Sequence, residues 1–329
     1  MLLNKIRYNS IAVRWQYDNL NWNIMQKNLL KWYHVYGRHE LPWRNTEDVY
    51  KIYLSEIMLQ QTQVNRVRDE YYPQFLKKFP TLKKLADAKE EEVLAAWSGL
   101  GYYSRARNLH KTAKLCQKQL PQNYKELLKL PGIGSYTASA ICSFAYHQNI
   151  VVLDTNIKRV IKRFYALLDD NEKILNNAAS KILNEKEPRA HNLALMDLGS
   201  LLCTPKNPNC KECPLSMQCQ GKEEPELYTQ TKKTQYETMD LFFGVCIQTD
   251  KIALVKTQGS MYKGMLALPT VDPLEENFIT SFKHAYTKYR LTVKLYHLEE
   301  APKEALWVHQ DDLHTIPLSS LVKKAIAMI

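Results

Sequence analysis

The sequence predicts a mostly helical, basic domain followed by a smaller domain of mixed strands and helices. From about residue 25 to residue 202, apolar residues recur three and four positions apart and strand-like alternation is scarce, which is typical of helices. After residue 238 the pattern changes: residues 241–247, 251–256 and 291–298 favour strands. Helices are expected near residues 274–283 and 318–329.

The expected domain boundaries follow these changes in pattern. We interpret residues 1–24 as an N-terminal extension and residues 25–220 as the helical domain. Residues 221–237, rich in Lys, Glu, Thr and Gln, are expected to form a linker to the second domain, residues 238–329. A chain of 329 residues is long enough for two domains with separate cores.

The excess of basic over acidic residues lies in the first part of the chain. The formal net charge is +11, yet residues 238–329 hold 10 Lys+Arg and 10 Asp+Glu, so the whole excess lies in residues 1–237. This asymmetry favours a polyanionic partner for the helical domain, nucleic acid before membrane. A merely soluble basic surface is the alternative explanation.

Composition also indicates the cellular compartment in which the protein is expected to act. No run approaches the roughly 18 apolar residues of a membrane helix. Four of the seven cysteines lie within residues 203–219, which does not suggest a disulfide scaffold. A cytoplasmic, reducing location is therefore expected, with no membrane partner.

One carboxylate lies on an apolar helix face. If residues 49–67 form a helix that advances by about 100° per residue, one broad face gathers Val49, Ile52, Tyr53, Ile57, Leu59, Val64 and Val67. Glu56 falls in the middle of that face, whereas Leu54 and Met58 fall outside it. Glu56 is either paired with an arginine or desolvated, and desolvation would raise its pKa and suit it to general acid catalysis.

A glycine-containing turn interrupts two helical stretches, residues 124–130 and 135–145. Gly132 and Gly134 flank one apolar residue, so backbone N–H groups can point outward at the start of the next helix. Such a turn suits a DNA phosphate. An ordinary helix–helix turn is the alternative.

Asp154 precedes a helix that begins near residue 155 and is expected to cap it. A capping carboxylate can also present its outer oxygen to a ligand, so the two roles are compatible. Cleavage of a glycosidic bond requires one protonated and one ionised carboxyl group, and Glu56 and Asp154 are the candidates.

Four cysteines have the spacing C-x6-C-x2-C-x5-C: Cys203, Cys210, Cys213 and Cys219. Four thiols in one short loop indicate a metal site. Tetrahedral thiolate sites suit zinc or an iron–sulfur cluster, and spacing alone does not choose between them. Zinc ribbons usually have two close cysteine pairs, whereas only one is present here.

Together these motifs resemble a known family. Residues 54–64 (LSEIMLQQTQV), 99–107 (GLGYYSRAR) and 130–134 (LPGIG) resemble the MutY-type adenine DNA glycosylases. The cysteine spacing matches the [4Fe–4S] loop of that family and of endonuclease III. The resemblance runs from about residue 25 to the C-terminus. It implies a helix-hairpin-helix fold that binds DNA between a six-helix barrel and a cluster-bearing subdomain.

The resemblance also implies catalytic roles. Glu56 matches the acid that protonates adenine, Asp154 the carboxylate that stabilises the oxocarbenium sugar, and Asn156 its polar neighbour. Tyr136 stands where endonuclease III carries a nucleophilic lysine. A phenol cannot form a Schiff base, so we expect a monofunctional glycosylase without strand cleavage.

Further residues match DNA-contacting positions of the family. Gln61 and Tyr102 match the side chains that wedge into the stack beside the extruded base. Arg105, Gly132 and Gly134 lie in the motifs expected to contact DNA. The adenine pocket is expected to include Leu41, Trp43 and Arg44.

The second domain resembles the Nudix-like domain that recognises 8-oxoguanine in this family. The supporting segments are residues 264–269 and 305–307. Tyr286, Thr287 and Lys288 stand where the family shows Phe-Ser-His. Two more departures are Thr155, in place of a glycine, and Leu193, in place of a Glu or Gln expected to read the adenine edge.

The leading hypothesis is a monomeric enzyme that removes adenine opposite 8-oxoguanine or guanine in double-stranded DNA. The main alternative is a thymine or uracil mismatch glycosylase of the same superfamily, although those enzymes lack the separate C-terminal domain. A non-catalytic damage-binding protein and a zinc DNA-binding module are hypotheses of other classes.

Overall fold

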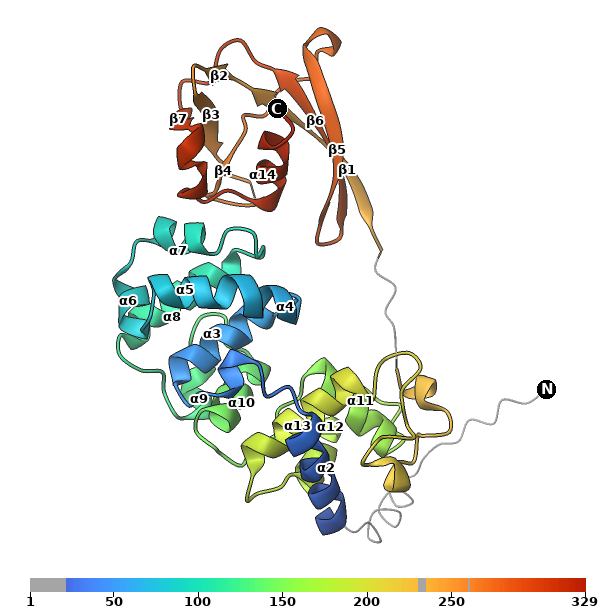
Figure 1. Ribbon diagram of the computed structural model, residues 1–329. Coiled ribbons are helices and arrows are strands. Elements are labelled where there is room, and N and C mark those ends of the chain that lie inside the picture. Colours follow the sequence, from blue (N-terminus) through green and yellow to red (C-terminus); the bar gives the residue numbers. More distant parts are fainter. Residues whose placement is uncertain (1–21, 230–234, 260) are drawn as a thin grey trace, which may run out of the picture. The chain divides into compact units, whose positions relative to one another are not determined.

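The computed structural model describes residues 22–229, 235–259 and 261–329 (Figure 1). The chain divides into two compact units, each built from two stretches: residues 1–47 with 134–231, and residues 48–133 with 232–329. Most of the expected extension, and residues 230–234 of the expected linker, lie outside the described residues. The expected helical domain, residues 25–220, is divided between the two units. The expected boundaries at residues 220 and 238 stay a prediction.

The first unit is helical. Its elements are α2 (Trp22–Tyr36), η1 (Pro42–Arg44), α10 (Ser135–Phe144), α11 (Thr155–Phe164), α12 (Glu172–Ile182), α13 (Pro188–Leu201), η3 (Ser216–Gln218) and η4 (Pro225–Tyr228). Helix α13 packs against α2, α10 and α11. Helix α11 is amphipathic, and its buried apolar residues Ile157, Val160, Ile161 and Phe164 recur three and four positions apart.

The second unit begins with the helices that follow Glu47. They are α3 (Val49–Leu59), α4 (Val64–Arg66), the π-helical turn η2 (Val67–Tyr71), α5 (Tyr72–Lys78), α6 (Leu82–Asp87), α7 (Glu90–Ala96), α8 (Ser104–Cys116) and α9 (Tyr124–Leu127). Helix α3 contacts α5 and α8. Asp48 caps α3 by accepting hydrogen bonds from the N–H groups of Tyr50 and Lys51.

Two expectations for α3 were wrong. The helix expected over residues 49–67 stops at Leu59, because the backbone turns at Gln61, where φ is +57°. Leu54 and Met58, expected outside the apolar face, are fully buried, so α3 is enclosed on all sides rather than on one.

The C-terminal part of the second unit contains two small sheets. In the first, β1 (Glu237–Val245) pairs in parallel with β6 (Tyr289–His297), which pairs antiparallel with β5 (Phe278–Tyr286). In the second, β3 (Lys251–Lys256) pairs antiparallel with three short strands, which are β2 (Ile247–Gln248), β4 (Leu266–Ala267) and β7 (Leu306–His309).

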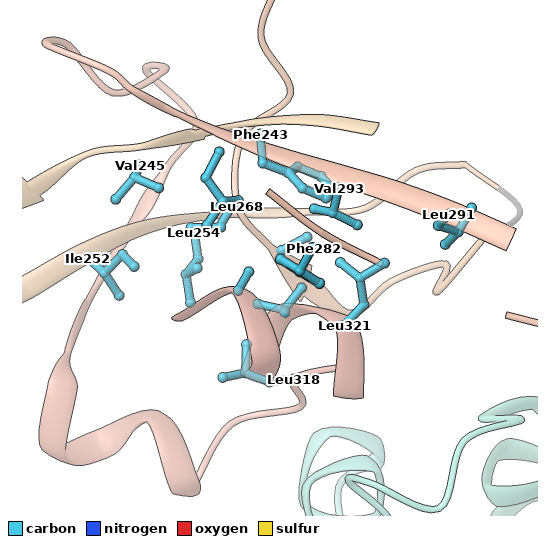
Figure 2. Packing of buried hydrophobic residues seen from close by; sticks show 14 residues of the cluster. Phe243, Val245, Ile252, Leu254, Leu268, Phe282, Leu291, Val293, Leu318 and Leu321 are labelled. Carbon is cyan, nitrogen blue, oxygen red and sulfur yellow. The ribbon is translucent and has the colours of Figure 1, made fainter. Parts of the chain in front are cut away.

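One apolar core joins both sheets to the last helix, α14 (Ser320–Ile326), as Figure 2 shows. Phe243 and Val293 come from the first sheet, Ile252 and Leu254 from the second, and Leu321 from α14. The expected strands at 241–247, 251–256 and 291–298 are confirmed within a few residues, as is the helix near the C-terminus.

The helix expected at residues 274–283 was wrong. A short turn, η5 (Glu275–Asn277), is followed by strand β5. Phe278, Ile279 and Thr280 are aromatic or β-branched residues that suit a strand. The following two-residue turn brings β5 against β6 in register, with Tyr286 opposite Tyr289. Pairing with the next strand of the hairpin therefore outweighs the local helical pattern.

Among the helices of the described residues, none is both long and apolar enough to cross a membrane.

A buried histidine makes stability depend on pH. His191 on α13 is 0% exposed, and neither ring nitrogen has a hydrogen-bond partner among the described residues. Burial lowers the pKa of His191 to about 4. In the unfolded chain this histidine titrates near its ordinary value, so the unfolded state takes up the proton first as the pH falls.

We therefore expect this histidine to cost stability progressively as the pH drops below about 6.5. From pH 7.5 to 5 the loss should be on the order of 2 kcal/mol, and the variant His191→Leu should lack it. Urea midpoints of both proteins across this pH range measure the difference, with the exposed His34→Gln as a control. Equal acid sensitivity of the wild type and His191→Leu would contradict the expectation.

Candidate active site

The acid candidate lies on the enclosed helix of the second unit. Glu56 is 6% exposed, and its neighbours Ser55 and Ile57 are also buried. The Ser55 hydroxyl donates a hydrogen bond to the Ile52 carbonyl, so this polar neighbour is satisfied within the helix. The structure thus places Glu56 in the buried position that the apolar pattern indicates.

The two wedge candidates lie at irregular backbone positions of the same unit. Gln61 follows the end of α3, is exposed and has φ +57°. Tyr102 precedes α8, is 37% exposed and has φ +48°. Positive φ is uncommon for residues other than glycine, and such positions cluster at functional sites.

Arg105 lies between these two turns and does not face solvent. Its side chain is 8% exposed, and its terminal nitrogens Nη1 and Nη2 bind backbone carbonyls of both turns. The structure therefore places this expected DNA-contacting residue inside the protein, bound to backbone carbonyls.

The glycine turn has the backbone that its sequence indicates. Gly132 is exposed with φ +75°, and a β-carbon there would lie 2.7 Å from the Asn108 side chain. Gly134, also exposed, is the N-terminal capping residue of α10. Tyr136 lies half-buried in the first turn of that helix.

The second carboxylate, Asp154, belongs to the first unit and caps α11 as expected. One carboxylate oxygen accepts a hydrogen bond from the Ile157 N–H at 2.6 Å, and the other accepts one from the Asn156 amide at 2.9 Å. Burial raises the pKa of Asp154, and the hydrogen bonds from Ile157 and Asn156 and the charge of Arg159 oppose that rise. Thr155 is exposed at the first helical position.

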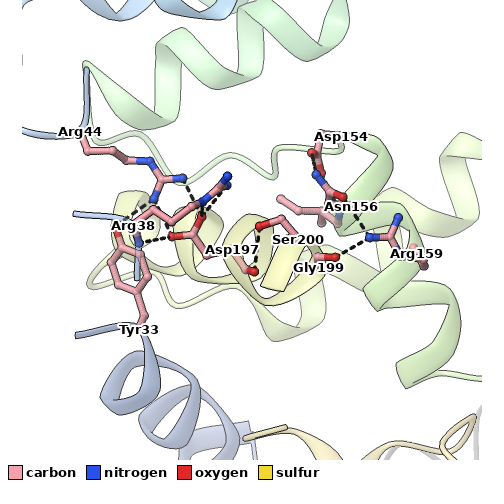
Figure 3. A network of polar contacts seen from close by, with 10 residues as sticks. Tyr33, Arg38, Arg44, Asp154, Asn156, Arg159, Asp197, Gly199 and Ser200 are labelled. Carbon is pink, nitrogen blue, oxygen red and sulfur yellow. Dashed lines mark hydrogen bonds and ion pairs between the residues drawn. The ribbon is translucent and has the colours of Figure 1, made fainter. Parts of the chain in front are cut away.

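Arg159 fixes the neighbour of Asp154 in place, as Figure 3 shows. Its guanidinium donates to the Asn156 side-chain oxygen at 3.0 Å and to the Gly199 carbonyl on α13. A β-carbon on Gly199 would lie 2.7 Å from that of Asn156, so only glycine allows this approach of α13 to α11. Arg159 also donates to the Cys203 carbonyl at 2.7 Å.

The expected adenine-pocket residues are held inside the first unit. Leu41 and Trp43 are buried, and so is Leu193 on α13. Arg44 forms two hydrogen bonds of 2.9 Å with Asp197, again on α13 (Figure 3). The free protein thus uses the Arg44 charge to fix this loop.

Asp197 was missed by the sequence reasoning. It is fully buried and also accepts hydrogen bonds from the Arg38 N–H and side chain. Burial alone would raise the pKa of Asp197, but Arg44 and Arg38 outweigh it and hold the pKa below its ordinary value. The signal available was one acidic residue inside the apolar run from Leu193 to Leu202.

The four cysteines gather in one small cavity of the first unit. Cys203, Cys210, Cys213 and Cys219 all line it, are half-buried and form no disulfide. Arg163 lies 3.3 Å from the Cys203 sulfur. Among the described residues, no group of three His, Cys, Asp or Glu side chains could hold a single metal ion.

The expected 8-oxoguanine contacts lie on the β5–β6 hairpin. Tyr286 ends β5, and its ring centre lies 4.6 Å from that of Tyr262. Thr287 (φ +51°) and Lys288 form the exposed turn, where Lys288 pairs with Glu237 at 2.6 Å.

Comparison with known proteins identifies relatives along most of the chain. The model of the family "HhH-GPD superfamily base excision DNA repair protein" matches residues 54–185. The adenine DNA glycosylase of Buchnera aphidicola subsp. Schizaphis graminum is 30% identical over 338 residues, covering 92% of this chain and 97% of the relative. That of Buchnera aphidicola subsp. Baizongia pistaciae is 43% identical over 205 residues, covering 60% of this chain and 58% of the relative.

A solved structure is similar to part of the chain. The structure of a thermostable thymine-DNA glycosylase superimposes with a TM-score of 0.58 and is 28% identical. The superposition covers 65% of this chain and 99% of that one.

The buried pairing of Asp197 with two arginines leads to a test of stability. Replacing Asp197 by Asn leaves the Arg44 charge buried without its counter-charge, so we expect a loss of about 3 kcal/mol in unfolding free energy. Urea unfolding followed by circular dichroism measures the loss. The matched variant Asp87→Asn removes the exposed ion pair with Lys83 and should change stability little. Similar midpoints for both variants would contradict this expectation.

Proposed function

The chain belongs to the adenine DNA glycosylase family of base-excision repair enzymes, and from that premise we propose that it excises adenine mispaired with 8-oxoguanine or guanine in double-stranded DNA. The observation that carries the proposal is the buried carboxyl of Glu56, within the segment that the family model matches.

In the proposed first step, Glu56 protonates the adenine ring. The N-glycosidic bond then breaks, its electron pair leaves with the protonated base, and positive charge develops on the sugar. The burial of Glu56 on α3 supports this role.

Asp154 is proposed to stabilise the positive sugar. This role needs the ionised form, which the Ile157 N–H, the Asn156 amide and the Arg159 charge favour against burial. Asn156 is a positioning residue in this scheme, because its amide binds one Asp154 oxygen directly. Water then adds to the sugar and completes hydrolysis.

The proposed reaction ends at base removal. Strand cleavage by this superfamily requires an amine that forms a Schiff base with the sugar, and Tyr136 offers a phenol. Incubation with borohydride should therefore trap no covalent protein–DNA product.

The proposed DNA contacts extend over both units. Gln61 and Tyr102 would fill the space left by the extruded base, since insertion offsets part of the unstacking cost. The backbone of the exposed residues Gly132 and Gly134 would bind a phosphate. Leu41, Trp43 and Arg44 would line the adenine pocket.

The C-terminal sheets are proposed to form a Nudix-like domain that recognises 8-oxoguanine. The exposed hairpin turn at Thr287 and Lys288, with Tyr286 beside it, is the proposed contact. Lys288 offers a cation where the family has an imidazole, although Glu237 pairs with it in the free protein.

The cysteine loop fits a [4Fe–4S] cluster, with Cys203, Cys210, Cys213 and Cys219 as its ligands. Four thiols line one cavity, as such a cluster requires. Burial raises the pKa values of the Cys213 and Cys219 thiols, and a bound cluster would favour their ionised forms. When bound, the cluster would cross-link this loop.

We further propose that the enzyme acts as a monomer in the cytoplasm.

A thymine or uracil mismatch glycosylase is the alternative, favoured by the superposition on a thymine-DNA glycosylase. That superposition covers 99% of the thymine enzyme but only 65% of this chain, so part of this chain has no counterpart in the thymine enzyme. The alignment over 92% of the chain with an adenine glycosylase supports the adenine substrate instead.

A panel of duplexes tests the proposal. Under single-turnover conditions, we expect base release from adenine opposite 8-oxoguanine and opposite guanine, and none from T·G or U·G. Cutting only the pyrimidine mismatches would refute the adenine proposal.

Glu56→Gln serves as the catalytic control in that panel. It should slow base release by about 10²–10⁴-fold, the usual contribution of a general acid, while DNA affinity stays nearly unchanged. Glu91→Gln, an exposed change on α7 of the same charge type, should retain full activity. Full activity of Glu56→Gln would exclude the acid role.

The cofactor has its own test. Protein purified without oxygen should be brown, with broad visible absorbance, and Cys213→Ser should lose most of that absorbance. Cys116→Ser, at the end of α8, should retain it. A colourless wild type carrying one equivalent of zinc would instead support the zinc hypothesis.

A further inference from the structure

One buried guanidinium connects the two turns that carry the wedge candidates. Arg105 stands at the second position of α8. Its Nη1 donates to the carbonyls of Ile57 at 2.9 Å, Met58 at 3.0 Å and Gln60 at 2.5 Å. Its Nη2 donates to the carbonyls of Leu100 at 3.2 Å and Gly101 at 3.3 Å, and to the Thr62 hydroxyl at 3.3 Å.

These contacts reach the peptide groups that precede both wedge candidates. The Gln60 carbonyl directly precedes Gln61, and the Gly101 carbonyl directly precedes Tyr102. Gln61 and Tyr102 both have positive φ, a conformation that persists only where the surroundings enforce it. Arg105 therefore holds the peptide group before each wedge candidate from one point.

The same guanidinium also binds the C-terminal end of α3, the helix that carries Glu56. The last carbonyls of a helix lack partners within it, and Ile57 and Met58 belong to the last turn of α3, directly after Glu56. A positive charge at this end also interacts favourably with the helix dipole.

Two aromatic rings lie close to the guanidinium of Arg105. The centres of the Trp97 and Tyr102 rings lie 5.5 and 5.4 Å from the guanidinium carbon. Trp97 also donates its indole N–H to the Gly101 carbonyl at 3.1 Å. Burial lowers the pKa of Arg105 to about 10, so the side chain stays charged at neutral pH.

We propose that Arg105 is a positioning residue for base extrusion, which sets Gln61 and Tyr102 at a fixed spacing from each other and from the helix of Glu56. This inference rests on the proposed function, because the two side chains act as wedges only if a base is extruded. A lysine cannot reproduce these contacts, since one ammonium nitrogen with three hydrogens cannot bind all six acceptors that the two guanidinium nitrogens share.

The test follows extrusion directly, without base cleavage. In the Glu56→Gln background, 2-aminopurine placed beside the target adenine reports loss of stacking as a rise in fluorescence. We expect Arg105→Lys, which keeps the charge, to slow this rise by about tenfold or more, since small misplacements carry large rate costs. DNA affinity at low salt should change far less.

The matched control is Arg107→Lys on the same helix. Arg107 pairs with Glu90 and donates to the Lys263 carbonyl, so it touches neither turn through these bonds. Its extrusion rate should equal that of the background protein. Should Arg105→Lys fail to fold, Gly101→Ala changes one turn alone. The φ angle there is +74°, and among the described residues no atom beyond its chain neighbours lies within 4 Å of an added β-carbon. That variant should also slow extrusion.

The outcomes separate the two levels of the proposal. No fluorescence change with the background protein, and no adenine release by the wild type, would refute the proposed function itself. A normal rise with folded Arg105→Lys and Gly101→Ala would overturn the role of Arg105. A lower melting temperature with an unchanged extrusion rate would overturn it equally, because it would show a structural role only.

Discussion

Irregular loops in this protein are held by arginine side chains that bind backbone carbonyl groups. A buried carbonyl that is not in a helix or sheet needs a donor, and a planar guanidinium can serve several at once. Arg105 does so for the turns around Gln61 and Tyr102, Arg163 for the cysteine loop, and Arg189 for the carbonyls of Arg44 and Thr46. The proposed roles of the wedge turns, the cysteine loop and the loop at Arg44 depend on this type of bond.

Helix α11 shows how this bonding joins separate features. Its first residues hold Asp154 through the Ile157 N–H and the Asn156 amide, and one turn later Arg159 binds both Asn156 and the Cys203 carbonyl. The carboxylate and the cysteine loop therefore share a short series of hydrogen bonds. Neither can move far without a change in the same helix, which gives the cysteine loop a structural reason to lie where it does.

Local sequence patterns predicted much of the fold and of the candidate site. Contacts between separate elements account for the rest. Asp154 as a cap, Glu56 as a buried residue and the strands around Phe243 and Leu254 follow from periodicity and capping rules. The end of α3 is bound by Arg105, 46 positions after Leu59, and strand β5 pairs with the next strand, β6. The Asp197 network joins residues more than 150 positions apart, so no local window contains both partners.

The interior use of arginine alters what the net charge of +11 means. A basic residue releases condensed counterions from DNA only when it reaches a phosphate, and the number released sets the slope of affinity against salt concentration. Guanidinium groups already bound to carbonyls or to Asp197 count toward the formal charge but neutralise no phosphate in this arrangement. The salt slope of DNA binding should therefore reflect the surface lysines and arginines alone, and be shallower than the basic composition suggests.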